Sequence, residues 1–186
     1  MIKKISILIF SLYSHVSNAS LDFDTGIKLI NFNSYQTQKI KKATELIKRI
    51  VRSEEFKNRV LEFEYKGKKQ FFDNLGLSNQ EIYERILNGA EIMNPEKNSK
   101  MDVEVELYHE KTNTIGYTYP NVMRIWMNKK YFEKYSPTQV ADNLFHEWMH
   151  KLGFDHALRH NQDRPYSVPY ALGYLIEELA AKHYEP

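Results

Sequence analysis

The sequence predicts a single α+β domain in which a small mixed sheet packs on helices. One segment alternates strictly between apolar and polar residues, which is typical of a strand with one buried face, and several others repeat apolar residues at helical spacing. No internal repeat, long linker or low-complexity tract divides the chain. Its 186 residues are enough for one domain with a full hydrophobic core.

The first 19 residues have the organisation of a secretory signal peptide. Two lysines at positions 3 and 4 precede an apolar run over residues 5–10, and Ser17-Asn18-Ala19 offers small residues at a cleavage site. The run is shorter than the roughly 20 residues that a membrane anchor needs. We therefore expect residues 1–19 to be removed and residues 20–186 to form a secreted or periplasmic domain without a stable membrane anchor. The alternative is an N-terminal strand or helix of the fold.

The charge balance of the expected mature protein excludes one class of partner. Removal of residues 1–19 takes away two lysines and no acid, leaving 24 basic and 24 acidic side chains. A formally neutral protein lacks the basic excess of a nucleic-acid binder. The chain has no cysteine, so it has neither disulfides nor a cysteine for a lipid anchor.

In the first third of the chain, a segment in which apolar and polar residues alternate weakly is followed by segments with helical spacing of apolar residues. Residues 26–33 are expected to form a first strand, and residues 37–52 a helix with apolar positions at helical spacing. Ser53 can cap a second helix that continues to about residue 64. The basic side chains of this region are interpreted as a solvated helix face rather than a binding patch: Lys39, Lys41, Lys42, Lys48 and Arg49.

The middle of the chain contains a short helix and the remaining strands. Ser78-Asn79-Gln80-Glu81 is a capping box that opens a helix ending at Gly89. Residues 101–107 alternate strictly and predict a half-exposed strand, and residues 122–128 predict the last strand before the central helix. Residues 115–120 could form either an edge segment beside a cleft or a surface hairpin.

A central helix is predicted over residues 137–152. Ser136 can cap it, Pro137 suits its first position, and Gln139 completes a capping box. Its apolar stripe is expected to face the core: Ala141, Phe145, Trp148 and Leu152. A further helix is predicted after Tyr170.

The end of the central helix contains three histidines at metal-ligand spacing. His146 and His150 are four residues apart, so their imidazoles project from one helix face. Gly153 can adopt a left-handed conformation that turns the chain back and presents His156. Three imidazoles with a fourth position open are typical of a catalytic zinc, and Glu147 is well placed to reach a water on the metal. Imidazole also suits other divalent metals, but zinc is the favoured one.

These residues resemble the signature of the metzincin zinc endopeptidases, His-Glu-x-x-His-x-x-Gly-x-x-His, over all five positions. The resemblance implies a metzincin-like domain with a zinc-binding helix, a turn below the metal and a C-terminal helix. It further implies a metallopeptidase that hydrolyses peptide or protein substrates, with His146, His150 and His156 as zinc ligands and Glu147 as general base. Metzincins bind an extended peptide beside an edge strand, which would be residues 115–120 here.

The chain departs from this family in the turn after the third histidine. That turn contains a methionine in metzincins, whereas no methionine follows Met149 here. Matching Tyr170 to the tyrosine that astacin-like and serralysin-like members carry near the metal places Val168 in the methionine position. A one-residue gap would leave Pro169 beside that position instead. By this resemblance Tyr170 could donate a hydrogen bond to the oxyanion; a core or turn aromatic is the alternative.

Other interpretations stay open at the level of sequence. A gluzincin-like hydrolase would take its third ligand from Glu177 or Glu178, and His160 could replace His156. The chain could also be a non-catalytic secreted protein that binds zinc, although an intact Glu147 argues against this. Asp155 and Asp163 are possible partners of the ligand histidines.

Overall fold

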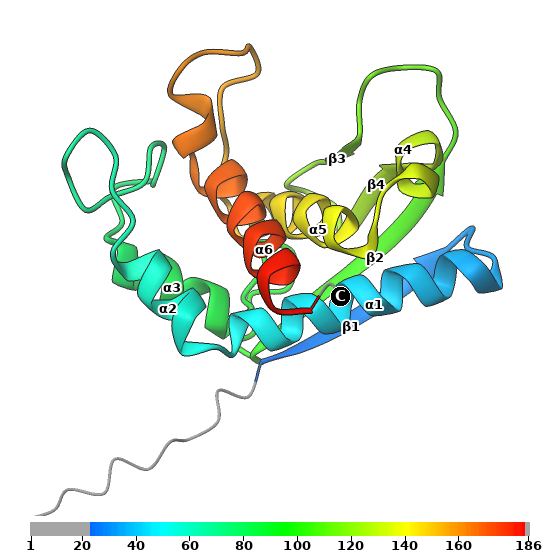
Figure 1. Ribbon diagram of the computed structural model, residues 1–186, viewed down its shortest axis with the longest axis horizontal. Helices are drawn as coiled ribbons and strands as arrows, with labels where there is room; N and C mark the ends of the chain where they lie inside the picture. The colour runs from blue at the N-terminus through cyan, green and yellow to red at the C-terminus, as the bar shows by residue number, and fades with distance from the viewer. Residues whose placement is uncertain (1–22, 185–186) are drawn as a thin grey trace, which may run out of the picture.

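The computed structural model describes residues 23–184, which form an α+β fold as predicted (Figure 1). The expected signal peptide, residues 1–19, lies outside these described residues. The strands of the described chain are β1 (Asp24–Ile30), β2 (Lys100–Tyr108), β3 (Gly116–Thr118) and β4 (Arg124–Asn128). The α-helices are α1 (Ser34–Val51), α2 (Glu54–Leu61), α3 (Asn79–Asn88), α4 (Lys129–Lys134), α5 (Pro137–Lys151) and α6 (Val168–Tyr184).

The strands form one mixed sheet in the order β1-β2-β4-β3. Strand β2 is parallel to both β1 and β4, with Val105 opposite Leu29 on one side and Ile125 on the other. Strand β3 pairs with β4 in the antiparallel direction and lies at the edge. Both alternatives left open for residues 115–120 therefore describe the segment, which is an edge strand and also forms a hairpin with β4.

The alternation of β2 separates a buried face from an outer face, as expected. Met101, Val103, Val105 and Leu107 are all buried in the core. Their neighbours on the other face are charged: Arg124 binds Glu104 and Glu106, each at 2.8 Å.

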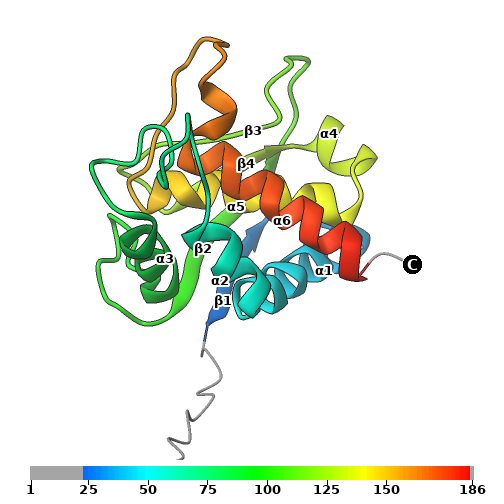
Figure 2. The ribbon, with the colours of Figure 1, turned by 60° about the vertical axis from the view of Figure 1, so that its left-hand side comes forward.

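Helix α5 packs on α1 and along α6, and Figures 1 and 2 show these three helices lying together on one side of the sheet. The predicted apolar stripe of α5 is buried: Ala141, Phe145, Trp148 and Leu152 are all at most 2% exposed. No helix among residues 23–184 is long and apolar enough to cross a membrane.

The predicted helix ends hold where a cap is explicit, whereas α2 stops at Leu61, three residues before its predicted end. Ser53, Ser78 and Ser136 cap α2, α3 and α5, and Gly89 ends α3 in the left-handed conformation. Helix α1 begins at Ser34, three residues earlier than expected, because Asn33 and Gln36 form a capping box at its N-terminus. The short helix α4, capped by Asn128, was not predicted; six residues are too few for a periodic pattern to be visible.

The interpretation of the basic residues on α1 is wrong for Lys39. Lys41, Lys42 and Arg49 are exposed as expected, but Lys39 is only 9% exposed. Its Nζ donates to three carbonyl oxygens at the end of α4, those of Phe132 (3.0 Å), Glu133 (3.1 Å) and Tyr135 (2.9 Å). A cation is favourable there because these carbonyls form the negative end of the helix dipole.

Lys39→Met is therefore expected to destabilise the protein. The substitution retains most of the aliphatic volume but leaves three partly buried carbonyls without a charged donor. Hydrogen bonds to charged groups contribute about 1.5–3 kcal/mol, so chemical denaturation should show a loss in that range. Lys42→Met, at an exposed position of the same helix, serves as the control and should change stability by less than about 0.5 kcal/mol. Equal effects of the two variants would contradict this role of Lys39.

Candidate metal centre and active-site cleft

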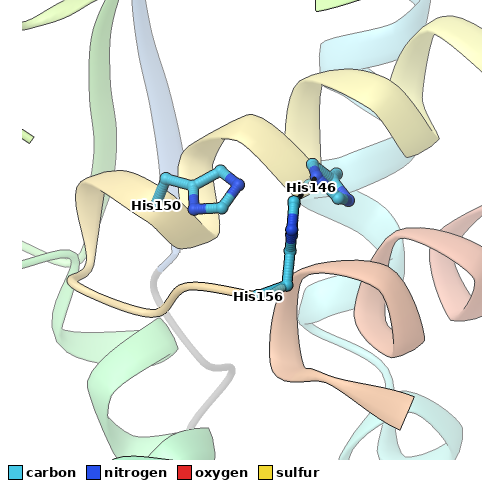
Figure 3. Close-up of side chains that lie close together, drawn as sticks. All are labelled: His146, His150 and His156. Atoms are coloured by element: carbon cyan, nitrogen blue, oxygen red, sulfur yellow. Dashed lines mark hydrogen bonds between the residues drawn. The ribbon is translucent and has the colours of Figure 1, made fainter. Parts of the chain in front are cut away.

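The C-terminal half of α5 places His146 and His150 on one face of the helix, and the chain then turns to bring His156 opposite them. Gly153 makes this turn with φ at 95°, in the left-handed region that favours glycine. Figure 3 shows His146 and His150 projecting from the helix and His156 projecting from the segment that follows it, toward a common point.

The imidazoles are close enough to share one cation. One ligand atom from each of the three histidines lies within 4.8 Å of the others, and among residues 23–184 no other group of three potential ligands is this close. The Nε2 atoms of His146 and His156 are 3.2 Å apart. In a tetrahedral zinc site, with Zn–N bonds of about 2.0–2.1 Å, two ligand nitrogens are separated by about 3.3 Å.

Backbone carbonyls bind the opposite side of each ring. The Nδ1 atoms of His150 and His156 donate to the carbonyl oxygens of Phe154 (2.8 Å) and Ala157 (3.2 Å). His146 donates to the backbone of Pro169, which has no N–H. Neutral imidazoles held in this way present bare Nε2 lone pairs to one another. Such an arrangement is repulsive unless a cation lies among the nitrogens, so the donor set fits a metal.

The surroundings keep these histidines neutral, which metal binding requires. Burial lowers the pKa of His150 to about 4 and lowers the pKa of His146 well below its usual value. Burial also lowers the pKa of His156. In each case the cause is the loss of water around the charged form.

Glu147 is a buried carboxylate that faces the same cleft. Its side chain is 5% exposed and lines the cleft with the histidines. Burial raises the pKa of Glu147 to about 8, and the opposing effect of Lys151 is smaller. Within residues 23–184 the carboxylate forms neither a hydrogen bond nor an ion pair. It is therefore free to accept a proton or a hydrogen bond from a bound molecule.

Lys151, which the sequence did not single out, connects α5 to the loop that follows the edge strand β3. The residue is 2% exposed, and its Nζ donates to the carbonyl oxygens of Tyr119 (2.9 Å) and Val122 (2.6 Å) just after β3. Burial lowers the pKa of Lys151 to about 8. The only feature of the sequence that points to Lys151 is its position four residues after Glu147, which places the two side chains on the same side of α5.

Tyr170 lies directly beside the histidines. Its ring centroid is 4.4 Å from that of His146 and 4.7 Å from that of His156. The guanidinium of Arg164, also not singled out from sequence, lies 4.7 Å from the ring centre of Tyr170. Burial raises the pKa of Tyr170 while Arg164 opposes this, so the phenol stays protonated and can donate at neutral pH.

The turn expected before Tyr170 is shorter than predicted. Helix α6 begins at Val168, so Tyr170 lies in its first turn rather than in a loop. Val168 is fully buried in the hydrophobic core. A short 3-10 helix, η1 (Arg164–Tyr166), precedes it and carries Arg164 into the cleft.

The side of α5 that carries His146 and His150 opens into a cleft of about 850 Å³. Strand β3 borders it with Gly116, Tyr117 and Thr118, and α6 borders it with Tyr170 and Tyr174. The cleft thus lies between an edge strand, a helix carrying the histidines and a second helix carrying tyrosines.

A buried carboxyl binds α5 on the side of the helix that faces away from the histidines. Glu91, 1% exposed, accepts from the indole Nε1 of Trp148 at 2.8 Å and from the backbone N–H of Asp102 at 2.9 Å. Burial raises the pKa of Glu91. Because Asp102 belongs to β2, this carboxyl joins that strand to α5 on the side opposite His146 and His150.

The alternative ligands lie apart from the three histidines. His160 lines the cleft but is exposed and does not belong to the close group. Glu178 binds Arg59 through both carboxylate oxygens, and Glu177 lines the cleft outside the group. Of the two carboxylates considered as partners of the histidines, Asp155 lies 3.7 Å from the Nδ1 of His150, whereas Asp163 accepts a hydrogen bond from Tyr65 at 2.6 Å instead.

Comparison with known proteins adds no family assignment to this geometry. No family model matches the sequence, and neither the curated proteins nor the solved structures yield a match.

Proposed function

We propose that this chain is an exported zinc-dependent endopeptidase of metzincin type. The observation that carries the proposal is the convergence of three bare imidazole nitrogens and a buried, unpartnered Glu147 in one cleft. An edge strand along this cleft supports a peptide substrate, because an extended chain can pair with its free side. The charged and apolar regions of residues 1–19 support export.

Each part of the site has a role in the proposed hydrolysis. A zinc ion held by His146, His150 and His156 would supply an acidified water and polarise the scissile carbonyl. Glu147 accepts the proton of the attacking water and returns it to the leaving amine. Tyr170 donates a hydrogen bond to the carbonyl oxygen as its negative charge develops. Strand β3 aligns the peptide, and Lys151 keeps that strand against α5.

Metal removal and restoration test the proposal. Protein purified after export should begin near Ser20, contain one zinc per chain, and cleave a denatured protein substrate. A chelator should abolish cleavage, and added zinc should restore it, because the histidines hold the metal in the only close ligand group among residues 23–184.

Two variants separate the ligand sets. His156→Ala should lose the zinc, whereas Glu177→Gln should retain it; the reverse result would favour a gluzincin-like site. Fully zinc-loaded protein that cleaves no protein or peptide would exclude the endopeptidase and leave a non-catalytic zinc-binding protein.

A further inference from the structure

The cleft continues beyond the histidines along two facing helix surfaces. On α5, Asp142 precedes His146 by four residues and so lies one turn away on the same face. On α6, Tyr170, Tyr174 and Glu177 follow one another at helical spacing. All five of these side chains line the cleft. His146 and Tyr170 therefore face each other at one position along the cleft. About one helical turn further along, the cleft is lined by Asp142, Tyr174 and Glu177.

The two helices approach closely at this level because α6 carries a glycine there. A Cβ atom on Gly173 would lie 2.3 Å from Oδ1 of Asp142 and 3.3 Å from Cβ of His146. The Asp142 carboxylate thus rests against the bare backbone of α6, next to Tyr174. Any larger residue at position 173 would displace either this carboxylate or the histidine helix.

The two carboxylates have no basic partner among residues 23–184. Within the described chain, neither Asp142 nor Glu177 forms an ion pair, whereas the adjacent Glu178 is paired with Arg59. Burial, reinforced by the nearby charge of Glu177, raises the pKa of Asp142 to about 7. Burial is the main cause that raises the pKa values of Tyr135 and Tyr174, with smaller contributions from the same two carboxylates, and both tyrosines line the cleft. Two unpaired acids between aromatic rings form an environment that a cation would stabilise.

A ligand in this cleft is indicated independently by Glu147. Its carboxylate is 5% exposed and unpartnered within the described chain, yet it borders the same space. A buried polar group of this kind is stabilised by a hydrogen-bonding partner, and no group among residues 23–184 supplies one.

We infer that Asp142 and Glu177 form a specificity pocket that selects substrates with a lysine or arginine side chain next to the scissile bond. The inference rests on the proposed peptidase function. Asp142 lies one helical turn, about 5.4 Å along the helix axis, from His146. This distance corresponds to between one and two residues of an extended peptide, so the pocket receives a side chain next to a peptide bond held at the histidines. The pocket binds the substrate side chain that points toward the N-terminal half of α5. There Tyr135 and Tyr174 contact the aliphatic part of that side chain, and the two carboxylates bind its positive charge.

Matched peptides test this pocket. The peptides differ only in carrying lysine, norleucine or glutamate on either side of the cleaved bond, and kcat/KM is measured for each. Wild-type protein should prefer lysine to its uncharged isostere norleucine by about 10-fold or more at one of the two positions. Asp142→Asn and Glu177→Gln should each reduce this ratio, and the double variant should bring it close to one.

Controls separate the pocket from the catalytic step. Glu178→Gln removes the neighbouring charge on α6 outside the pocket and should keep the wild-type ratio. Binding of the same peptides to the Glu147→Gln variant, followed by fluorescence anisotropy, gives the lysine preference without turnover. Melting temperatures and zinc contents identify any variant that has lost its fold or metal.

The outcomes distinguish this inference from the function on which it rests. The pocket would be ruled out if the wild-type protein cleaved lysine and norleucine peptides equally, or if the double variant kept the wild-type ratio of lysine to norleucine kcat/KM. Either result would leave the proposed peptidase function intact. Zinc-loaded wild-type protein that neither cleaves nor binds any of the peptides would overturn both. A preference for lysine that disappears in the double variant supports the pocket.

Discussion

Glu147→Gln is expected to retain the zinc and the fold but to lose nearly all peptide hydrolysis. The amide has the same shape as the carboxylate and can occupy the same 5% exposed position, but it cannot accept the proton of the attacking water. Removal of a general base typically lowers the rate by a factor of about 10² to 10⁴. Steady-state kinetics on a fluorogenic peptide, together with zinc analysis of the same samples, measures this effect.

A matched substitution excludes a general effect of charge loss. Glu84→Gln removes a glutamate from an exposed position of α3 and should leave kcat/KM unchanged. Wild-type turnover in Glu147→Gln with full zinc content would rule out Glu147 as the base and, with it, the proposed mechanism.

The same substitution has a second, independent signature in metal-free protein. Because burial raises the pKa of Glu147 to about 8, the folded state binds a proton more tightly than the unfolded state, where the usual value is 4.5. The free energy of unfolding should therefore decrease as the pH rises from the unfolded pKa through the folded pKa. Glutamine has no proton to lose, so metal-free Glu147→Gln should not show this part of the decrease. Parallel stability profiles of the two proteins above pH 5 would contradict the burial of an ionisable group here.

Tyr170→Phe is expected to lower kcat with little change in KM. The phenol ring lies within 4.7 Å of the His146 and His156 ring centres, so its hydroxyl can reach a carbonyl oxygen that is held there. A donor that acts only as negative charge develops stabilises the transition state and not the bound substrate. Loss of one such donor commonly lowers the rate by about 10² to 10³.

The interpretation of this variant depends on an unaltered site. Zinc content and melting temperature should stay near wild type because neither a ligand nor appreciable volume is removed. Tyr35→Phe, on α1 and 65% exposed, is the control for loss of a phenolic hydroxyl and should have no effect on kcat. An unchanged kcat in Tyr170→Phe would assign Tyr170 to packing alone.

Local signals in the sequence were sufficient for much of the secondary structure. The caps at Ser53, Ser78 and Ser136, the left-handed glycines at positions 89 and 153, and the alternation of residues 101–107 all occur as predicted. Each of these features depends on residues within one or two turns of one another, so its energy is determined mainly by neighbours in the chain. Helix α4 and the early start of α6 were missed because they are short or are stabilised by distant contacts.

The sequence alone was sufficient to predict that His146 and His150 share one face of a helix. It was also sufficient to predict that the chain can turn back toward them at Gly153. Helical periodicity and glycine's access to positive φ are sufficient for both statements. The metal ligands remain a prediction, but the structure places all three nitrogens within 4.8 Å of one another.

Tertiary packing alone decided which charged side chains are buried and which are brought together in the cleft. Lys39 and Lys151 are lysines like many others in the sequence, yet each is buried on backbone carbonyls far away in the chain. Asp142 and Glu177 are 35 positions apart and face one cleft only because α6 packs on α5 at Gly173. Burial and long-range proximity determine whether a charged residue stays solvated, positions a strand or binds a ligand. Neither property is encoded in the few residues on either side of it.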